Sequence, residues 1–458
     1  MQNIKVNQLI KYCMVFVMII TIFIFIIPKN VEGSFNIMIM FTFVLNGTIW
    51  FVLFIREVKK YPYSFMMMHW FFCIMFFFLA PIVQYAYKEF PWIYSRTEEL
   101  LLRTNIYLFL WTLGLYLGSK FIKKNKWSIT KSIFNKEYVN GKNVMIILTC
   151  ISGLIMIWRL SKVGFGNLLA RATADMEYSS NSSLSLLIGQ CCQAICYFAV
   201  IISLLEWKRN KRSFSWVIIN AIFLCISYFP TALARYAMAA IYGGCVLTFM
   251  KKKRRSRLFI MAFIIAFMIL LPLLNAFRRT EFMEVSLVEN LVNVVTNLDT
   301  GFLEGDYDAY TMFTITIEDV DRNGITWGMQ MLGAILFFVP RSIWKDKPVG
   351  SGHFVAGNLD WEFTNLSCPL PAEAYINFGV IGIIIFSFVI GNLLGKVDLW
   401  YWEKNNTKNG ICKLGELFYP ILMFMFFFMS RGDLMSSFAY SCAFFAVGFI
   451  ILHGIKSK

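Results

Sequence analysis

Charged residues are scarce in this sequence. Only 15% of its 458 residues are Asp, Glu, Lys or Arg, whereas about 25% is usual in soluble domains. Apolar residues make up 58% of the chain, and 47 residues are Phe. A water-soluble surface could not carry this composition, because large contiguous apolar patches cause aggregation. The composition therefore excludes a soluble enzyme and predicts a protein that crosses a membrane several times.

The sequence also lacks the motifs of a metalloprotein. Its 11 cysteines fall mainly in apolar runs, and no CxxC pair repeats at the spacing of a zinc site. We expect them to be small apolar residues within helices. Asp306 and Asp308, in EGDYDAY, resemble a DxD metal site, but two acidic residues in a loop are a weak signal, and no metal is expected. No convincing internal repeat, low-complexity tract or soluble globular domain is evident.

Long apolar runs take the place of these features. A bilayer core about 30 Å thick requires roughly 20 apolar residues per helix. The expected fold class is an all-α polytopic membrane protein with about 12 transmembrane helices. The predicted spans are 9–27, 35–55, 63–83, 100–119, 143–160, 183–205, 214–229, 233–250, 258–277, 376–396, 416–430 and 434–453. No small-residue cleavage site follows the first run, so we expect it to be retained as a span.

Positive residues concentrate in alternate loops, and this asymmetry predicts the orientation. The basic loops follow the second, fourth, sixth, eighth and tenth predicted spans, and further lysines lie near both ends of the chain. Both termini are therefore predicted to be cytoplasmic, and most acidic residues are predicted to lie outside. The net charge of +16 reflects this topology, so nucleic acid is not an expected partner.

One apolar segment, 329–340, is too short to cross the membrane. A full span there would invert the basic loops that follow, so we expect an external interfacial or re-entrant helix that returns to the same side. Residues 278–375 then form one external segment, and loops of that length usually carry function. The predicted organisation is nine N-terminal spans (1–277), a large external catalytic loop (278–375) and three C-terminal spans (376–458).

Several arginines stand at the predicted outer ends of spans, where the positive-inside tendency disfavours them. A guanidinium binds phosphate oxygens through paired donors and stays charged. Each arginine alone could instead pair with a carboxylate or a lipid headgroup, but together they indicate an anion site at the membrane surface. The group comprises Arg235, Arg278, Arg279, Arg341 and Arg431. In the hairpin MSRGDLMSS, we expect Asp433 to orient Arg431, with a plain internal Arg–Asp pair as the alternative.

Two further residues are candidate proton acceptors. Glu373, in PLPAEAYINFG, immediately precedes a predicted span, where burial would make its carboxylate a better proton acceptor. His353, in GSGHFVAG, lies among glycines that let the backbone approach a ligand closely. A hydrogen-bonded role within the loop is the alternative for His353.

The stretch FFVPRSIWKDKPVGSGHFVA, the following PLPAEAYINFGVIG and the late SRGDL hairpin together resemble the Wzy-type oligosaccharide repeat-unit polymerases, the O-antigen and capsule polymerase family of bacteria. The likeness covers about 278–433, and the layout of twelve spans with a large external loop is also similar. The resemblance implies a glycosyltransferase of the bacterial cytoplasmic membrane. On the outer face it would move a growing glycan from its undecaprenyl pyrophosphate carrier to the non-reducing end of a fresh lipid-linked repeat unit.

The resemblance also implies roles for the candidate residues. The five arginines and Asp433 would bind the pyrophosphate leaving group, and Glu373, or else His353, would accept the proton of the acceptor hydroxyl. No cofactor is implied, because the donor is already activated. Besides membrane lipids, the implied partners are the undecaprenyl-pyrophosphate-linked oligosaccharide, a repeat-unit flippase and a chain-length regulator.

Two other functions remain open. An O-antigen ligase would share the architecture and the lipid pyrophosphate donor. A flippase or other polysaccharide transporter would also tolerate twelve spans and a basic cavity, but it predicts ionisable residues in mid-span and repeat symmetry. Most polar residues of this chain stand at predicted outer ends and in one asymmetric loop, which favours an enzyme.

Overall fold

The computed structural model describes most of the chain, and the described part is predominantly helical. The described residues are 36–92, 97–121, 133–164, 183–230, 232–250, 257–264, 266–267, 300–402 and 413–457. Seven of the described helices are long and apolar enough to cross a membrane. They are Ile37–Lys60, Phe65–Tyr87, Glu98–Lys120, Lys142–Val163, Leu187–Asn210, Leu370–Trp402 and Leu434–Gly454. The protein is therefore an all-α polytopic membrane protein, as predicted.

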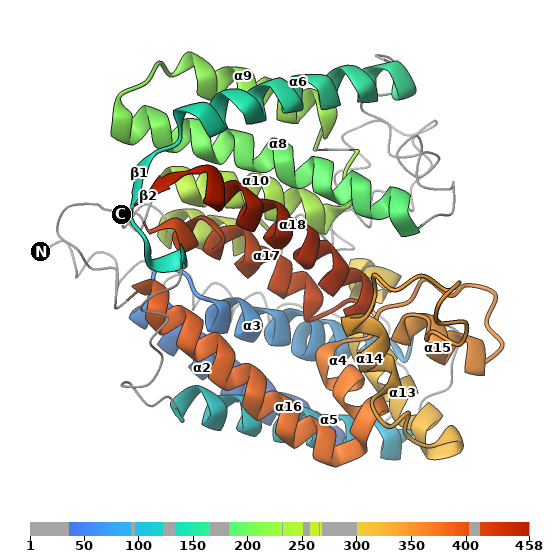
Figure 1. The fold of residues 1–458 in the computed structure, drawn as a ribbon. Helices are drawn as coiled ribbons and strands as arrows, with labels where there is room; N and C mark the ends of the chain where they lie inside the picture. The colour runs from blue at the N-terminus through green and yellow to red at the C-terminus, as the bar shows by residue number, and fades with distance from the viewer. Residues whose placement is uncertain are drawn as a thin grey trace, which may run out of the picture.

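The helices are labelled in the order in which they occur along the chain (Figure 1). Those of the first half are α2 (Ile37–Lys60), α3 (Phe65–Cys73), α4 (Ala80–Tyr87), α5 (Glu98–Lys120), α6 (Lys142–Val163), α8 (Ser183–Asn210), α9 (Ser215–Ser227) and α10 (Arg235–Met250). Those of the second half are α13 (Ala309–Asn323), α14 (Met329–Ile335), α15 (Ser351–Asn358), α16 (Leu370–Trp402), α17 (Tyr419–Met429) and α18 (Leu434–Gly454). Two short strands, β1 (Tyr138–Asn140) and β2 (Lys456–Ser457), pair antiparallel.

Ten of the twelve predicted spans coincide with these helices, three of which, α9, α10 and α17, are shorter than a full span. The predicted span 9–27 lies outside the described residues. The predicted span 258–277 is described only over 257–264 and 266–267, which are helical. The total of twelve therefore stays a prediction.

A fully buried helix occupies the middle of the bundle. It comprises α3, a π-helical stretch at Ile74–Leu79 and α4. Its sequence is apolar on every side, which is the pattern of a helix surrounded by other helices. Figure 1 shows α3 between the layer of α2, α5 and α16 and the layer of α17 and α18, and the contacts of α3 with α2, α16 and α17 agree.

The pair formed by α5 and α16 is packed especially closely because small residues line it. Gly114 and Gly118 of α5 form a GxxxG motif that faces α16, and Gly391 of α16 lies against the backbone of Leu115. Asn392 Nδ2 also donates to the Gly118 carbonyl at 3.2 Å. This contact matters for function because α16 carries Glu373 in its first turn.

Gly118→Ala should destabilise the protein. A Cβ at Gly118 would lie 2.0 Å from the carbonyl oxygen of Phe388, so α5 and α16 would have to move apart. We expect a loss on the order of 1–3 kcal/mol, typical of overpacking, measured as a lower midpoint of thermal unfolding in detergent. Gly357→Ala is the matched control, since a Cβ there meets nothing within 4 Å. Equal midpoints for the two variants would contradict the close packing.

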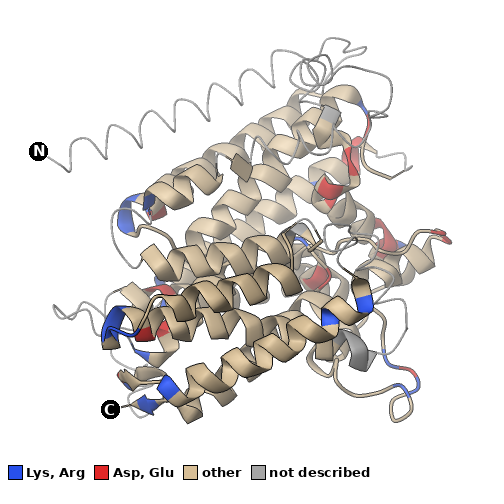
Figure 2. Ribbon diagram, turned by 90° about the horizontal axis from the view of Figure 1, so that it is seen from above, with Lys and Arg blue, Asp and Glu red and all other residues tan. Residues whose placement is uncertain are grey.

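The two ends of the bundle differ in charge. At one end, β2 pairs with β1, Trp400 Nε1 donates to Asn135 Oδ1, and Leu414 N donates to the Lys136 carbonyl. This end, beside the C-terminus, holds many of the described lysines and arginines, whereas most acidic residues lie at the opposite end, called here the acidic end (Figure 2). The separation agrees with the alternation of basic loops along the sequence.

The segment 329–340 begins and ends at the acidic end and does not cross the bundle. At its start, Met331 N donates to Asn377 Oδ1 at 3.1 Å. The chain then turns back, so that Gly350 packs against the carboxylate of Asp433. Only Met329–Ile335 of this segment is helical. This course is that of a re-entrant or interfacial segment rather than of a span.

The orientation itself remains a prediction, with the acidic end outside. Asp346 at the acidic end and Lys142 at the opposite end are both exposed. A membrane-impermeant thiol reagent added to intact cells should therefore label Asp346→Cys and not Lys142→Cys, with the parent chain giving the background of the natural cysteines. Labelling of Lys142→Cys alone would reverse the topology.

Candidate functional site

Segments that are far apart in sequence meet at the acidic end. The hairpin between α17 and α18 packs against the start of α16, where Leu370 N donates to the Ser430 carbonyl at 3.2 Å. The start of α15 lies beside the same hairpin through Gly350. The turn 305–308, just before α13, contacts it from another direction through Arg431. These segments carry several of the candidate residues.

Glu373 is buried, with 2% of its surface exposed, and both of its carboxylate oxygens accept hydrogen bonds. Ser351 Oγ donates to Oε2 at 2.7 Å, and Leu434 N donates to Oε1 at 2.9 Å. Glu373 therefore ties the first residue of α15 and the first residue of α18 to the start of α16. The sequence analysis found Glu373 but not Ser351, although Ser351 lies within the quoted motif GSGHFVAG.

Asp433 caps the N-terminus of α18, where its Oδ1 accepts a hydrogen bond from Ser436 N at 3.0 Å. Its other carboxylate oxygen lies so close to Gly350 that no side chain would fit there. Burial raises the pKa of the Asp433 carboxyl, while the amide of Ser436 and the nearby His353 act in the opposite direction. A side chain at position 350 would therefore displace the carboxylate of Asp433.

Arg431 is half-buried and pairs with Asp308, not with Asp433 as predicted. Its Nη2 donates to Asp308 Oδ1 at 3.0 Å and to the Gly305 carbonyl at 2.9 Å. Its Nε is buried and has no hydrogen-bond partner within the described part of the chain. The prediction that Asp433 orients Arg431 was wrong because Asp433 is engaged by the N-terminus of α18.

Asp308 is held in place by further donors. Ser367 Oγ donates to its Oδ1 at 2.7 Å, and Trp92 Nε1 donates to its Oδ2 at 3.2 Å. The preceding turn is fixed to the central helix by Gln84, whose Nε2 donates to the carbonyl of Tyr307 at 3.1 Å. Asp308 therefore anchors Arg431. This role differs from the metal binding that a DxD motif would suggest.

Arg341 and His353 are both exposed. Arg341 donates to the carbonyl oxygens of Lys347 at 2.7 Å and Pro348 at 3.4 Å, and His353 lies on α15 close enough to Asp433 to influence its charge. Arg235 is the first residue of α10, and its side chain is not among those described. The predicted residues Arg278 and Arg279 lie outside the described residues.

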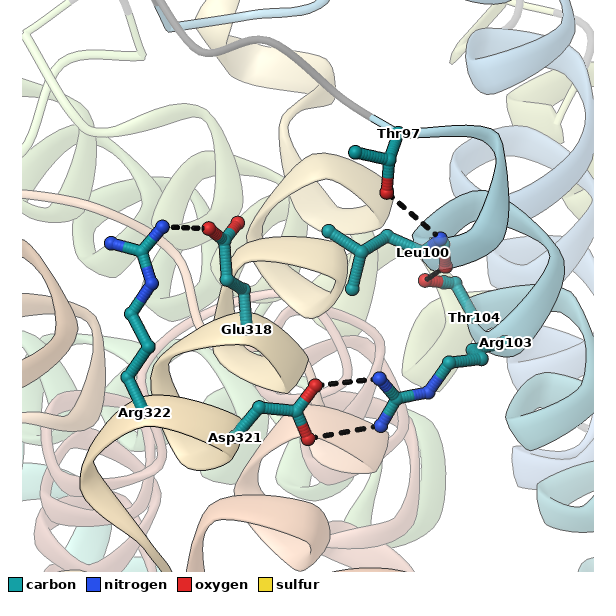
Figure 3. A network of polar contacts seen from close by, with 7 residues as sticks. All are labelled: Thr97, Leu100, Arg103, Thr104, Glu318, Asp321 and Arg322. Atoms are coloured by element: carbon teal, nitrogen blue, oxygen red, sulfur yellow. Dashed lines mark hydrogen bonds and ion pairs between the residues drawn. The ribbon is translucent and has the colours of Figure 1, made fainter.

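The sequence analysis missed another arginine at this end, Arg103 of α5. Figure 3 shows it facing Asp321 of α13, with two hydrogen bonds of 2.5 and 3.0 Å that form a planar fork. Arg322 and Glu318 form a second ion pair on α13. Its place near the outer end of the predicted span 100–119 could have revealed Arg103. Since Asp321 already neutralises it, Arg103 serves to join α5 to α13.

Cys368 lies close to Glu373 and Asp433. Its thiol is fully buried, and burial together with the carboxyl groups of Glu373 and Asp433 raises the pKa of this thiol. Within the described ranges, no three His, Cys, Asp or Glu residues gather closely enough to hold a metal ion. The side chains that are present can bind an anion through guanidinium groups and can accept a proton through carboxylate or imidazole.

Comparison with known proteins finds a similarity in the C-terminal part of the chain. The model of the family described as O-antigen polysaccharide polymerase Wzy matches residues 367–457. No curated protein and no solved structure matches the chain. The matched segment contains Glu373, Arg431 and Asp433, and it begins after Arg341 and His353. The match agrees with the resemblance drawn from the sequence: residues 367–457 are similar to the family of Wzy O-antigen polysaccharide polymerases.

Proposed function

We propose that this protein is a glycosyltransferase that polymerises undecaprenyl-pyrophosphate-linked oligosaccharide repeat units on the outer face of the bacterial cytoplasmic membrane, building a surface polysaccharide such as O-antigen or capsule. The proposal rests on one observation about where the candidate residues lie. The segment that matches the Wzy family holds Glu373, Arg431 and Asp433, which also gather at one end of the bundle.

The proposed reaction is a block transfer. The acceptor hydroxyl oxygen forms a bond to the anomeric carbon of the growing glycan, and the bond from that carbon to the pyrophosphate oxygen breaks. The lipid pyrophosphate leaves with the electron pair, and the hydroxyl proton passes to a base. Preorganised donors for a departing anion are commonly the largest catalytic term. Arg341 and Arg431 are the described residues proposed for that task, with Arg235, Arg278 and Arg279 as further candidates.

The base can be assigned in two ways. Glu373 is the first candidate, but its oxygens are already occupied, so the acceptor hydroxyl would have to replace the Ser351 hydroxyl as a donor. His353 is the second candidate, since it is exposed and lies near Asp433. Either residue lies at the acidic end, which is the proposed outer face. The proposed flippase and chain-length regulator partners rest on the family resemblance alone.

Purified protein incubated with lipid-linked repeat units tests the proposed function. Longer lipid-linked chains are expected. Transfer of the glycan to a different acceptor would instead indicate an O-antigen ligase. Unchanged lipid, with movement of the repeat unit across a vesicle membrane, would indicate a transporter. In each case, the product is resolved by its length and by its linkage to the lipid.

A further inference from the structure

The segment 327–347, called here the outer strap, has one packed face and one open face. Gln330 and Ala334 are buried, and α14 packs on α16 and α18. Large apolar side chains of the same segment are exposed to the surroundings, three of them on α14 at a spacing of three residues. The exposed members are Trp327, Met329, Leu332, Ile335, Phe338 and Ile343. Trp327 and Ile343 are 79% and 77% exposed, and an extended apolar surface of this kind is typical of a lipid or ligand contact.

Two cations, Arg341 and Lys347, lie on either side of Ile343 at the C-terminal end of this apolar stripe. Lys347 Nζ donates to the carbonyl oxygens of Phe337 and Val339, and Arg341 donates back to the carbonyl of Lys347. These bonds fix the position of both charges without neutralising them. Neither cation forms an ion pair with a residue in the described ranges. Burial and the nearby Arg341 lower the pKa of Lys347, and a bound anion would stabilise its charged form.

The cation pair is also linked along the chain to the carboxylates of Glu373 and Asp433. Arg341 reaches the Pro348 carbonyl, and two residues later Gly350 lies under the Asp433 carboxylate. Ser351, the next residue, donates to Glu373. A ligand whose phosphates bind Arg341 and Lys347 would therefore have its next group near Glu373 and Asp433.

We propose that the outer strap is the binding site for the lipid part of the donor, with the isoprenoid chain along the apolar stripe and the pyrophosphate on Arg341 and Lys347. Two fixed cations match the two charged phosphates of a lipid pyrophosphate better than the single phosphate of a common phospholipid. The inference rests on the proposed function for the identity of the ligand. It adds Lys347 as a binding residue and gives the direction of the lipid chain.

Binding of undecaprenyl pyrophosphate to the purified full-length protein, measured by native mass spectrometry, tests the inference without any polymerisation. Arg341→Gln and Lys347→Gln should each weaken binding at least about tenfold, as expected for a lost hydrogen bond to a charged group. Lys345→Gln is the matched control, because Lys345 is an exposed cation of the same turn. Equal losses in all three variants would indicate unspecific attraction and overturn the inference.

Two further probes separate the lipid chain from its headgroup. The pair of changes Leu332→Gln and Ile335→Gln should weaken binding of undecaprenyl pyrophosphate and leave inorganic pyrophosphate unaffected. Phosphatidylglycerol serves as the ordinary anionic lipid. If Arg341→Gln and Lys347→Gln reduce its binding as strongly as that of the pyrophosphate, the strap is a membrane anchor and the inference fails.

A crosslinking experiment on the unaltered protein guards against misfolded variants. A diazirine-bearing polyprenyl pyrophosphate should crosslink to the peptide that contains 327–347. Crosslinks confined to other peptides would overturn the inference. A protein that binds lipid pyrophosphate here but makes no polymer would retain the inference and refute the proposed function.

Discussion

Arg431→Ala is expected to abolish polymer formation in a protein that still inserts into the membrane. The change removes the one guanidinium that lies inside the segment matching the Wzy family. Losing a preorganised donor to a developing anion commonly costs roughly 10²–10³-fold in turnover. Arg431→Lys should recover little activity, because an ammonium group lacks the planar fork that could contact Asp308 and a phosphate together. Polymer length and amount per inserted protein are the measurements.

The ion pair with Asp308 requires a control, because removing Arg431 also leaves a buried carboxylate unpaired. Asp308→Asn removes that charge and keeps one acceptor oxygen for Trp92 Nε1, while the amide NH2 group can donate to the hydroxyl of Ser367. If Arg431 only neutralises Asp308, the double variant Arg431→Met with Asp308→Asn should regain turnover. If Arg431 binds the leaving group, the double variant stays inactive. Parent activity in the double variant would therefore refute the anion-binding role.

The sequence predicted the helices well because membrane insertion leaves a strong pattern. Uninterrupted apolar length marks a span, and the alternation of basic loops marks its direction. Such a pattern carries no information about which helix faces which. The contact of α5 with α16 depends on Gly114 and Gly118. The absence of a side chain at these positions matters only because the backbone of α16 packs against them, and the sequence does not show which helix does so. The short length of 329–340 was enough to indicate that it does not cross.

The sequence predicted part of the set of residues in the site, but it did not predict which of them form ion pairs with each other. Glu373, Arg431 and Asp433 stood out as charged residues next to apolar runs, and the structure brings all three to the acidic end. The partner of Arg431 is Asp308, 123 positions earlier in the chain. Sequence proximity favoured Asp433 instead. Only the folded chain shows that Asp433 is used by the N-terminus of α18.

Glu373→Gln is expected to lower turnover by the roughly 10²–10⁴-fold typical of the loss of a general base. The substitution suits the site. The amide oxygen of Gln can accept from Leu434 N, while its NH2 group can donate to the hydroxyl of Ser351, which is able to act as an acceptor. Packing, unfolding midpoint and donor binding should therefore be preserved. If Glu373 only holds the site together, turnover should be preserved as well, because Gln can make the same two contacts.

Single-turnover rates at saturating donor, measured across pH, separate the two roles, with Ser351→Ala as the matched variant. A base that must be deprotonated gives a rate that rises with pH on the acid side, and this limb should disappear in Glu373→Gln. Ser351→Ala frees Oε2 of Glu373 and should change the rate only slightly if Glu373 is the base. If Glu373 merely ties α15 to α16, Glu373→Gln can keep this contact and should retain turnover, whereas Ser351→Ala removes the contact and should lose activity. Parent turnover in Glu373→Gln would exclude it as the base, and His353→Gln would then be expected to remove the acid limb.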